Sequence, residues 1–184
     1  IKDIRDNSDK PIVVSMSSIA TSGGYYVSIG ADSILANPGT ITGSIGVIMG
    51  YPTVTDLMEI LGLSYTIIKS GQYKDSGSPF RKTSSSDSLY LTMIVDELHD
   101  QFKTDVQMER HLSLGEINRI AQGQIFSGRQ ALELDLIDKI GTFEDAIWLI
   151  SNMAGFSTRP NLIKIPKKRI GLVDAILGEI KLKL

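Results

Sequence analysis

Short apolar runs alternate with stretches of helical periodicity along the chain. The apolar runs are bounded by turn residues and predict strands over residues 12–16, 33–36, 64–69 and 161–165, with a glycine-rich strand or loop over 43–49. Helices are predicted over residues 22–30, 53–61 and 143–154, the last ending at Gly155. Strands that alternate with helices in this way are typical of an α/β domain with largely parallel strands.

The longest predicted helix follows a loop rich in serine, glycine and proline at residues 70–86. One face of this helix is apolar at helical spacing and consists of Leu91, Ile94, Val95, Leu98 and Phe102. Two capping boxes, Ser113 with Glu116 and Ser127 with Gln130, predict the starts of two further helices.

Composition limits the possible chemistry. The 184 residues are 42% hydrophobic, enough for a sizeable core in one domain, and the net charge of −2 gives no basic field for nucleic acid. The sequence has no cysteine and two histidines, which excludes thiol nucleophiles, disulfides and histidine-rich metal sites. No apolar run reaches transmembrane length. The chain begins with Ile1 rather than methionine, and we expect it to be a piece of a longer protein.

Ser22 is the candidate nucleophile. It stands in the stretch IATSGGYY, between a predicted strand and a predicted helix, and two glycines follow it. Backbone N–H groups at the start of a helix lack helical partners, so the Gly23 amide could receive an oxyanion, and glycine leaves room for a substrate. Serine is also among the preferred N-cap residues, so the local pattern alone is compatible with a purely structural role.

A serine nucleophile needs a base within hydrogen-bond reach. His99 and His111 lie on or just after the long charged helix, where a solvated histidine is the ordinary expectation. Lys69 and Lys74, in KSGQYKD, are the alternatives, because a buried lysine can be neutral. The residues alone do not choose between the two lysines.

The glycines of GTITGSIG raise a different possibility, a phosphate-binding loop. Their spacing is not G-x-G-x-x-G, and no Lys-Ser/Thr pair follows them. The pattern therefore does not favour nucleotide binding.

Several ordered motifs together resemble a known family. SMSSIATSGGYYVSIGADSILANPGTITGSIGVIMG, then IIKSGQYKDSGSPFR, then GQIFSGRQALELDLIDKIGTFEDAI are similar to the signal peptide peptidase A family, also called protease IV. The resemblance covers about residues 11–155. It implies a ClpP/crotonase-like fold and a serine protease with a Ser/Lys catalytic dyad.

The resemblance also implies roles for particular residues. Ser22 falls on the nucleophile, Lys74 on the base, and Ser44 on the serine that orients the lysine. Gly23 falls on one donor of the oxyanion hole. The second donor would lie upstream of Ile1, so we expect this piece alone to have weak or no activity. We expect no cofactor and no metal in the site.

The same resemblance implies a domain division, a location and partners. Residues 1–155 would form the catalytic domain, N-terminally truncated, and residues 156–184 a C-terminal strand and amphipathic helix that pack on the domain or on a neighbouring subunit. The parent protein would be a membrane-anchored, ring-like homo-oligomer whose catalytic domain faces the extracytoplasmic side and degrades signal peptides.

The C-terminal helix would follow a basic cluster. The cluster consists of Lys164, Lys167, Lys168 and Arg169, and the apolar face after it of Ile170, Val173, Ile176, Leu177 and Ile180.

Alternatives for the function are an NfeD-associated type of Ser/Lys membrane protease, a crotonase-fold acyl-CoA enzyme and an inactive assembly module.

Overall fold

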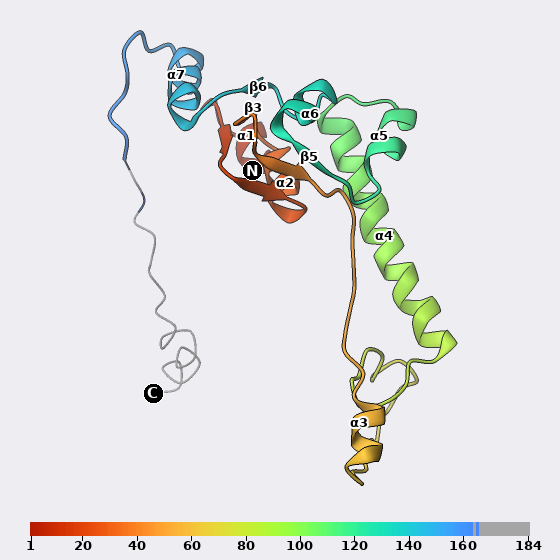
Figure 1. The fold of residues 1–184 in the computed structure, drawn as a ribbon. Coiled ribbons are helices and arrows are strands. Elements are labelled where there is room, and N and C mark those ends of the chain that lie inside the picture. Colours follow the sequence, from red (N-terminus) through yellow and green to blue (C-terminus); the bar gives the residue numbers. More distant parts are fainter. Residues whose placement is uncertain (164, 166–184) are drawn as a thin grey trace.

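The computed structural model describes residues 1–163 and residue 165, and it has two parts (Figure 1). We call residues 1–46 together with 98–153 the body, and residues 47–97 the arm. The body holds both sheets, whereas the arm projects away from them along the first half of a long helix.

The body is built on two three-stranded sheets. The first has β3 (Ser33–Ala36) between β1 (Val13–Met16) and β6 (Lys139–Ile140), all parallel. In the second, β4 (Ile41–Gly43) pairs in parallel with β2 (Ile19–Thr21) and antiparallel with β5 (Ile125–Ser127). The α/β class and the largely parallel strands predicted from the sequence are therefore confirmed.

Helices cover the sheets. The chain begins with α1 (Lys2–Asp6), α2 (Gly23–Ser28) follows β2, and α6 (Gly128–Glu133) packs on β4, β5 and β6. The second half of α4 (Ser85–Glu109) packs with α5 (Leu114–Ile120), and α7 (Phe143–Met153) packs on β1. The central strand β3 is buried along Ile34, Leu35 and Ala36, which places the core between the sheets and these helices.

The predicted capping boxes at Ser113 and Ser127 are both formed, and the structure has two more, at Ser84 and Thr142. The helix predicted over residues 53–61 is present in the arm as α3 (Thr55–Ile60), whose N-cap residue, Val54, makes no side-chain capping hydrogen bond. Gly155 has a φ of +79°, as expected for the residue that ends a helix.

The strand predicted over residues 64–69 is wrong. This segment lies in the arm and forms no strand, because no other strand runs beside it there to complete its hydrogen bonds. The described residues 161–163 and 165 also form no strand. The predicted C-terminal amphipathic helix and the four residues of the basic cluster before it lie outside the described residues.

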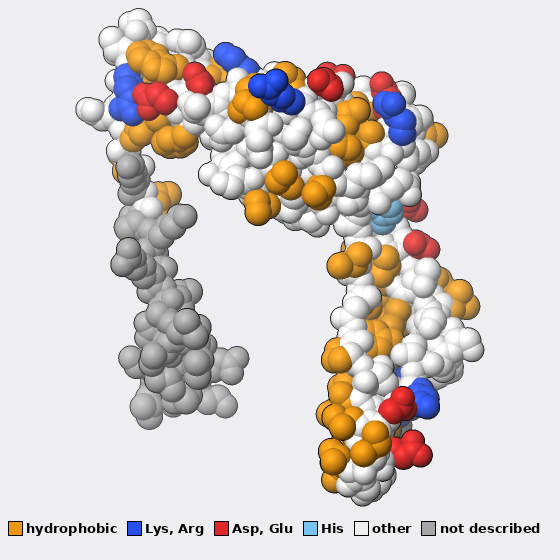
Figure 2. All heavy atoms as spheres, in the orientation of Figure 1, with side chains coloured by type: hydrophobic (Ala, Val, Ile, Leu, Met, Phe, Trp, Pro, Cys, Tyr) orange, Lys and Arg blue, Asp and Glu red, His pale blue; other side chains and the backbone are white. Residues whose placement is uncertain are grey.

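The apolar face of α4 is only partly covered. Phe102 is buried in the body, whereas Leu91, Ile94 and Val95 are half-buried and Leu98 is exposed. Figure 2 shows hydrophobic side chains along one side of the arm. Within the described residues, none of the helices combines the length and the apolar character needed to span a bilayer.

Candidate active site

Ser22 stands at the turn between β2 and α2 in an uncommon backbone conformation. Its φ is 50° and its ψ is −117°, a region that costs a residue other than glycine about 1–3 kcal/mol. Its carbonyl accepts a hydrogen bond from the Tyr26 amide at 2.8 Å, yet its side chain makes no capping hydrogen bond to the helix. The ordinary role of a serine at this position is therefore absent, and the hydroxyl is left available for other contacts.

The strand register brings Ser44 beside Ser22. Thr21 of β2 pairs with Gly43 of β4, so the next residue of each parallel strand emerges at the same edge of the sheet. The Ser22 amide donates to the Gly43 carbonyl at 2.8 Å, which carries the pairing past the end of β2. Ser44 also has a positive φ, 53°, and its amide donates to the Gln124 carbonyl at 2.7 Å.

Gly43 makes this close arrangement possible. Its φ is +75°, and a Cβ atom placed there would lie 2.6 Å from Cδ2 of Phe126 on the neighbouring strand. A side chain at this position would force β4 and β5 apart. The glycine therefore sets the path of the turn that presents Ser44.

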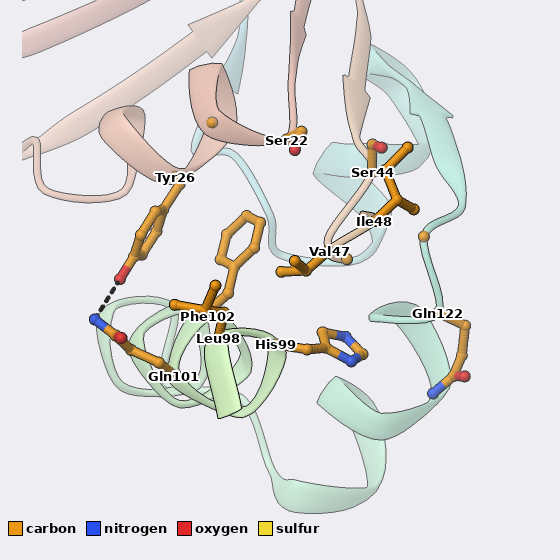
Figure 3. Close-up of a pocket in the computed structure, with 13 residues that line it drawn as sticks. Ser22, Tyr26, Ser44, Val47, Ile48, Leu98, His99, Gln101, Phe102 and Gln122 are labelled. Carbon is orange, nitrogen blue, oxygen red and sulfur yellow. Dashed lines mark hydrogen bonds between the residues drawn. The ribbon is translucent and has the colours of Figure 1, made fainter. Parts of the chain in front are cut away.

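Ser22 and Ser44 line one cavity of about 760 Å³ (Figure 3). The start of α2 and the segment after β4 form two of its walls, and residues of α4 and of the loop before β5 complete it. The lining residues are Ser22, Gly23, Tyr26, Ser44, Gly46, Val47, Ile48, Leu98, His99, Gln101, Phe102, Gln122 and Gly123. The cavity therefore joins parts of the chain that are up to a hundred residues apart.

His99 was expected to be solvated, but it is half-buried and lines this cavity. Its Nε2 lies 2.9 Å from the Ala121 carbonyl, so it links α4 to the loop that reaches Ser44. A sequence signal existed: His99 follows Val95 by four residues and precedes Phe102 by three, which places it on the apolar face of α4.

Two tyrosines fix α2 on either side. Tyr25 is fully buried and donates to the Leu136 carbonyl at 2.9 Å, and burial raises the pKa of its hydroxyl. The Tyr26 ring packs on Phe102 at 4.5 Å between centroids, and its hydroxyl donates to the Asp105 carboxylate, which raises the pKa of Tyr26. The turn at Ser22 is thus held by core packing as well as by the sheet.

Gly23 faces open space. A Cβ atom added there would meet no heavy atom within 4 Å, and its φ is not in the left-handed region. Packing therefore does not require glycine at this position. The absence of a side chain keeps the approach to the backbone amide beside Ser22 clear.

Lys74 is not among the residues that line the cavity. It is exposed in the loop between α3 and α4, which Figure 1 shows at the end of the arm away from α2. Lys69 lies in the same loop, and its Nζ donates to the Asp75 carboxylate at 2.6 Å and to the Gln72 carbonyl at 2.9 Å. The structure thus brings Ser22, Gly23 and Ser44 together and places both lysines elsewhere.

The site offers a serine hydroxyl, a second hydroxyl beside it and a free amide, the parts needed for acyl transfer except for a base. His99 contributes the one imidazole among the lining side chains, and its Nε2 is already engaged by the Ala121 carbonyl. No group of three or more potential metal ligands is found among the described residues.

The sequence matches one known protein family and several known proteins. The family model described as peptidase family S49 matches residues 4–156. A candidate protease of Synechocystis sp. is 42% identical over 144 residues, which cover 78% of this chain and 52% of that protein. A candidate signal peptide peptidase of Enterococcus faecium is 39% identical over 139 residues, covering 76% of this chain and 40% of that protein. The chain thus spans about half the length, or less, of these relatives.

Among solved structures, the chain is similar to a membrane-bound stomatin-specific protease, determined as a lysine-to-alanine mutant with a substrate peptide. The TM-score is 0.50 at 15% identity, and the match covers 97% of this chain and 74% of that one. This likeness concerns the fold, and it agrees with the predicted ClpP/crotonase-like architecture.

Replacing Ser22 tests whether its backbone stores strain. We expect Ser22→Gly to raise the free energy of unfolding by about 1 kcal/mol relative to Ser22→Ala, because glycine adopts a positive φ without cost and alanine does not. Chemical denaturation of both variants measures the difference. Equal stabilities would show that Ser22 is not strained.

Proposed function

Because the chain belongs to peptidase family S49, we propose that it forms the main part of the catalytic region of a serine endopeptidase that uses a Ser22/Lys74 dyad. One observation carries the proposal. Ser22 is strained, makes no capping hydrogen bond with its side chain, and lines a cavity together with Ser44 and the unobstructed amide of Gly23. Strained residues of this kind gather at active sites, and strand–serine–helix turns present nucleophiles in other hydrolases.

The proposed reaction is acyl transfer. The Ser22 Oγ attacks the scissile carbonyl carbon while its proton passes to Lys74 Nζ, and the Gly23 N–H donates to the developing oxyanion. The C–N bond then breaks, and Lys74 returns the proton to the departing amine. Water, deprotonated by Lys74, releases the acyl group and restores the Ser22 hydroxyl. Ser44 orients Lys74 by hydrogen bonding.

The contacts in the loop support Lys74 over Lys69 as the base. Lys69 already donates to Asp75 and Gln72, so its amine is committed within the arm. Lys74 makes no ion pair within the described part of the chain. A base must nevertheless come within about 3 Å of the serine.

We propose that the arm delivers Lys74 to the Ser22 cavity of a neighbouring copy. The end of the arm extends away from the cavity of its own copy and exposes large apolar side chains, among them Ile60 and Ile68, which are 80% and 97% exposed. Exposed apolar surface of this extent is typical of a protein–protein interface. A closed ring of copies would bury this surface and complete each site.

The proposed substrates are signal peptides. The cavity has an apolar part formed by Val47, Ile48, Leu98 and Phe102, which suits an extended apolar peptide. The Enterococcus faecium relative carries the name of a signal peptide peptidase. The proposed location of the whole protein is the membrane, with this region on the extracytoplasmic side.

The dyad can be tested by single substitutions in the full-length protein. We expect Ser22→Ala to abolish peptide cleavage and Lys74→Ala to lower kcat about 100- to 10,000-fold, since each removes a reacting group. Lys69→Ala and His99→Gln should each cost less than about tenfold. Lys82→Ala, which removes an exposed lysine from the same loop, is the matched control. Full loss with Lys69→Ala or His99→Gln, and none with Lys74→Ala, would reassign the base.

Mixing two inactive variants tests whether copies share a site. Co-expression of Ser22→Ala and Lys74→Ala chains should restore about a quarter of the wild-type activity, because random assembly pairs an intact serine with an intact lysine at about one site in four. Peptidase assays of the purified mixed assembly measure the recovery. An assembled mixture as inactive as its parents would place both residues of each dyad on one chain.

The role of Gly23 as an oxyanion donor can be tested by adding a methyl group in the open space beside it. Gly23→Ala should fold with the wild-type melting temperature, because the new methyl group meets no neighbour. It should lower kcat/KM about 10-fold or more by obstructing the approach to the oxyanion donor. Unchanged kcat/KM would remove Gly23 from the oxyanion hole.

A further inference from the structure

Both chain neighbours of Lys74 are fixed to the start of α4. The Tyr73 ring stacks on Tyr90 of α4 with 4.7 Å between centroids. On the other side, the Asp75 carboxylate is almost fully buried and receives two hydrogen bonds from Arg81, from Nε at 2.8 Å and from a terminal nitrogen at 3.0 Å. Lys74 itself is exposed. Lys74 thus has an exposed side chain, while the residues before and after it are both held in place.

Arg81 joins the turn to the helix. The two terminal nitrogens of its guanidinium donate to the Asp87 carboxylate at 2.5 and 2.9 Å, while Nε and one terminal nitrogen bind Asp75. Asp87 is also the third residue of α4 and the partner of Ser84 in its capping box, and it accepts from Ser84 Oγ at 2.6 Å. A planar fork with several donors can hold two carboxylates at once in a fixed orientation.

A second contact ties the turn to the same carboxylate. Ser76, two residues after Lys74, donates from Oγ to Asp87 at 2.6 Å. Within the turn, the Lys74 amide donates to the Gly71 carbonyl at 3.2 Å and the Ser76 amide to the Tyr73 carbonyl at 3.1 Å. The backbone of residues 71–76 is therefore held both internally and against α4.

The charges in this cluster balance. Lys69 and Arg81 face Asp75 and Asp87, and both aspartate side chains are 3% exposed. Hydrogen bonds from Arg81 and then Lys69 lower the pKa of Asp75 to about 2, and those from Arg81, Ser76 and Ser84 hold the pKa of Asp87 well below its usual range. Since both pKa values are depressed, the ion pairs persist above about pH 4 and are lost only as the pH falls through the folded-state values.

Buried ion pairs contribute little net free energy to folding, because desolvation offsets their attraction, but they hold groups in defined orientations. We propose that Arg81, through Asp75 and Asp87, is a positioning residue that fixes the turn carrying Lys74 to α4 and so aims its amine. The inference rests on the proposed role of Lys74 as the base. Arg81 acts on Lys74 through the turn and does not touch the substrate.

The test is a set of variants of the full-length protein assayed for kcat and KM on one peptide substrate, with activity normalised to assembled protein. Arg81→Lys keeps the charge but cannot bind two carboxylates in the same fork. We expect its kcat to fall tenfold or more, since displacing a reacting group by about 1 Å can cost about 100-fold. Its KM should stay within about twofold, because no residue of the turn or of the charged cluster lines the substrate cavity.

Ser76→Ala is a milder variant that removes one contact between the turn and Asp87 and leaves the ion pairs in place. It should fold as the wild type and lower kcat by a smaller factor, again with KM unchanged. Lys82→Gln, at the residue next to Arg81, is the matched control, because its side chain is 78% exposed and pairs only weakly with the exposed Asp56. Its kcat and KM should equal those of the wild type.

The outcomes separate this inference from the proposed dyad. If Lys74→Ala is inactive while Arg81→Lys and Ser76→Ala keep wild-type kcat, the dyad stands and the positioning role is wrong. If Arg81→Lys merely lowers the melting temperature or the assembled fraction, and the assembled protein has wild-type kcat, the cluster only folds the arm and the inference is overturned. If Lys74→Ala keeps wild-type kcat, the dyad fails and the inference fails with it.

Discussion

The parallel pairing of β2 with β4 is the constraint on which the site depends. It aligns Thr21 with Gly43, so two serines leave adjacent strands at the same edge of the sheet, and the bond from the Ser22 amide to Gly43 holds them there. On the other side of β4, Gly43 leaves room for Phe126 of β5, because a Cβ atom at residue 43 would lie 2.6 Å from Cδ2 of that ring. Burial of Tyr25 and the packing of Tyr26 on Phe102 support the same turn from the helix side. The strain at Ser22 persists because sheet and core together determine its backbone.

The proposed base is held by a different kind of interaction. The serines are fixed by main-chain hydrogen bonds and an apolar core, whereas the turn of Lys74 is fixed by a charged cluster and an aromatic stack against α4. Helix α4 connects the two, because its second half packs in the body and contributes Phe102 and His99 to the cavity, while its first half supports the arm. In a ring of copies, this helix would set where the Lys74 turn of one copy lies relative to the Ser22 cavity of its neighbour.

The sequence was informative where the determinants are local. Capping boxes at Ser113 and Ser127, the long helix, and the serine at a strand–helix joint were all predicted from neighbouring residues. Strands of two or three residues, such as β2 and β6, carry too little pattern to be recognised. The strand predicted over 64–69 failed because an apolar run forms a strand only beside a partner. His99 was misjudged because its neighbours in sequence are charged, while its contact, Ala121, comes from a distant loop.

We propose that Ser22, and not the adjacent Ser44, is the nucleophile, since Ser22 alone combines the strained strand–helix turn with the open Gly23 amide. The most direct measurement is mass-spectrometric mapping of the adduct formed when the full-length protein reacts with a fluorophosphonate. We expect the adduct to lie on Ser22 and Ser44 to be unmodified. An adduct on Ser44, or on any other residue with Ser22 unmodified, would exclude Ser22 as the nucleophile.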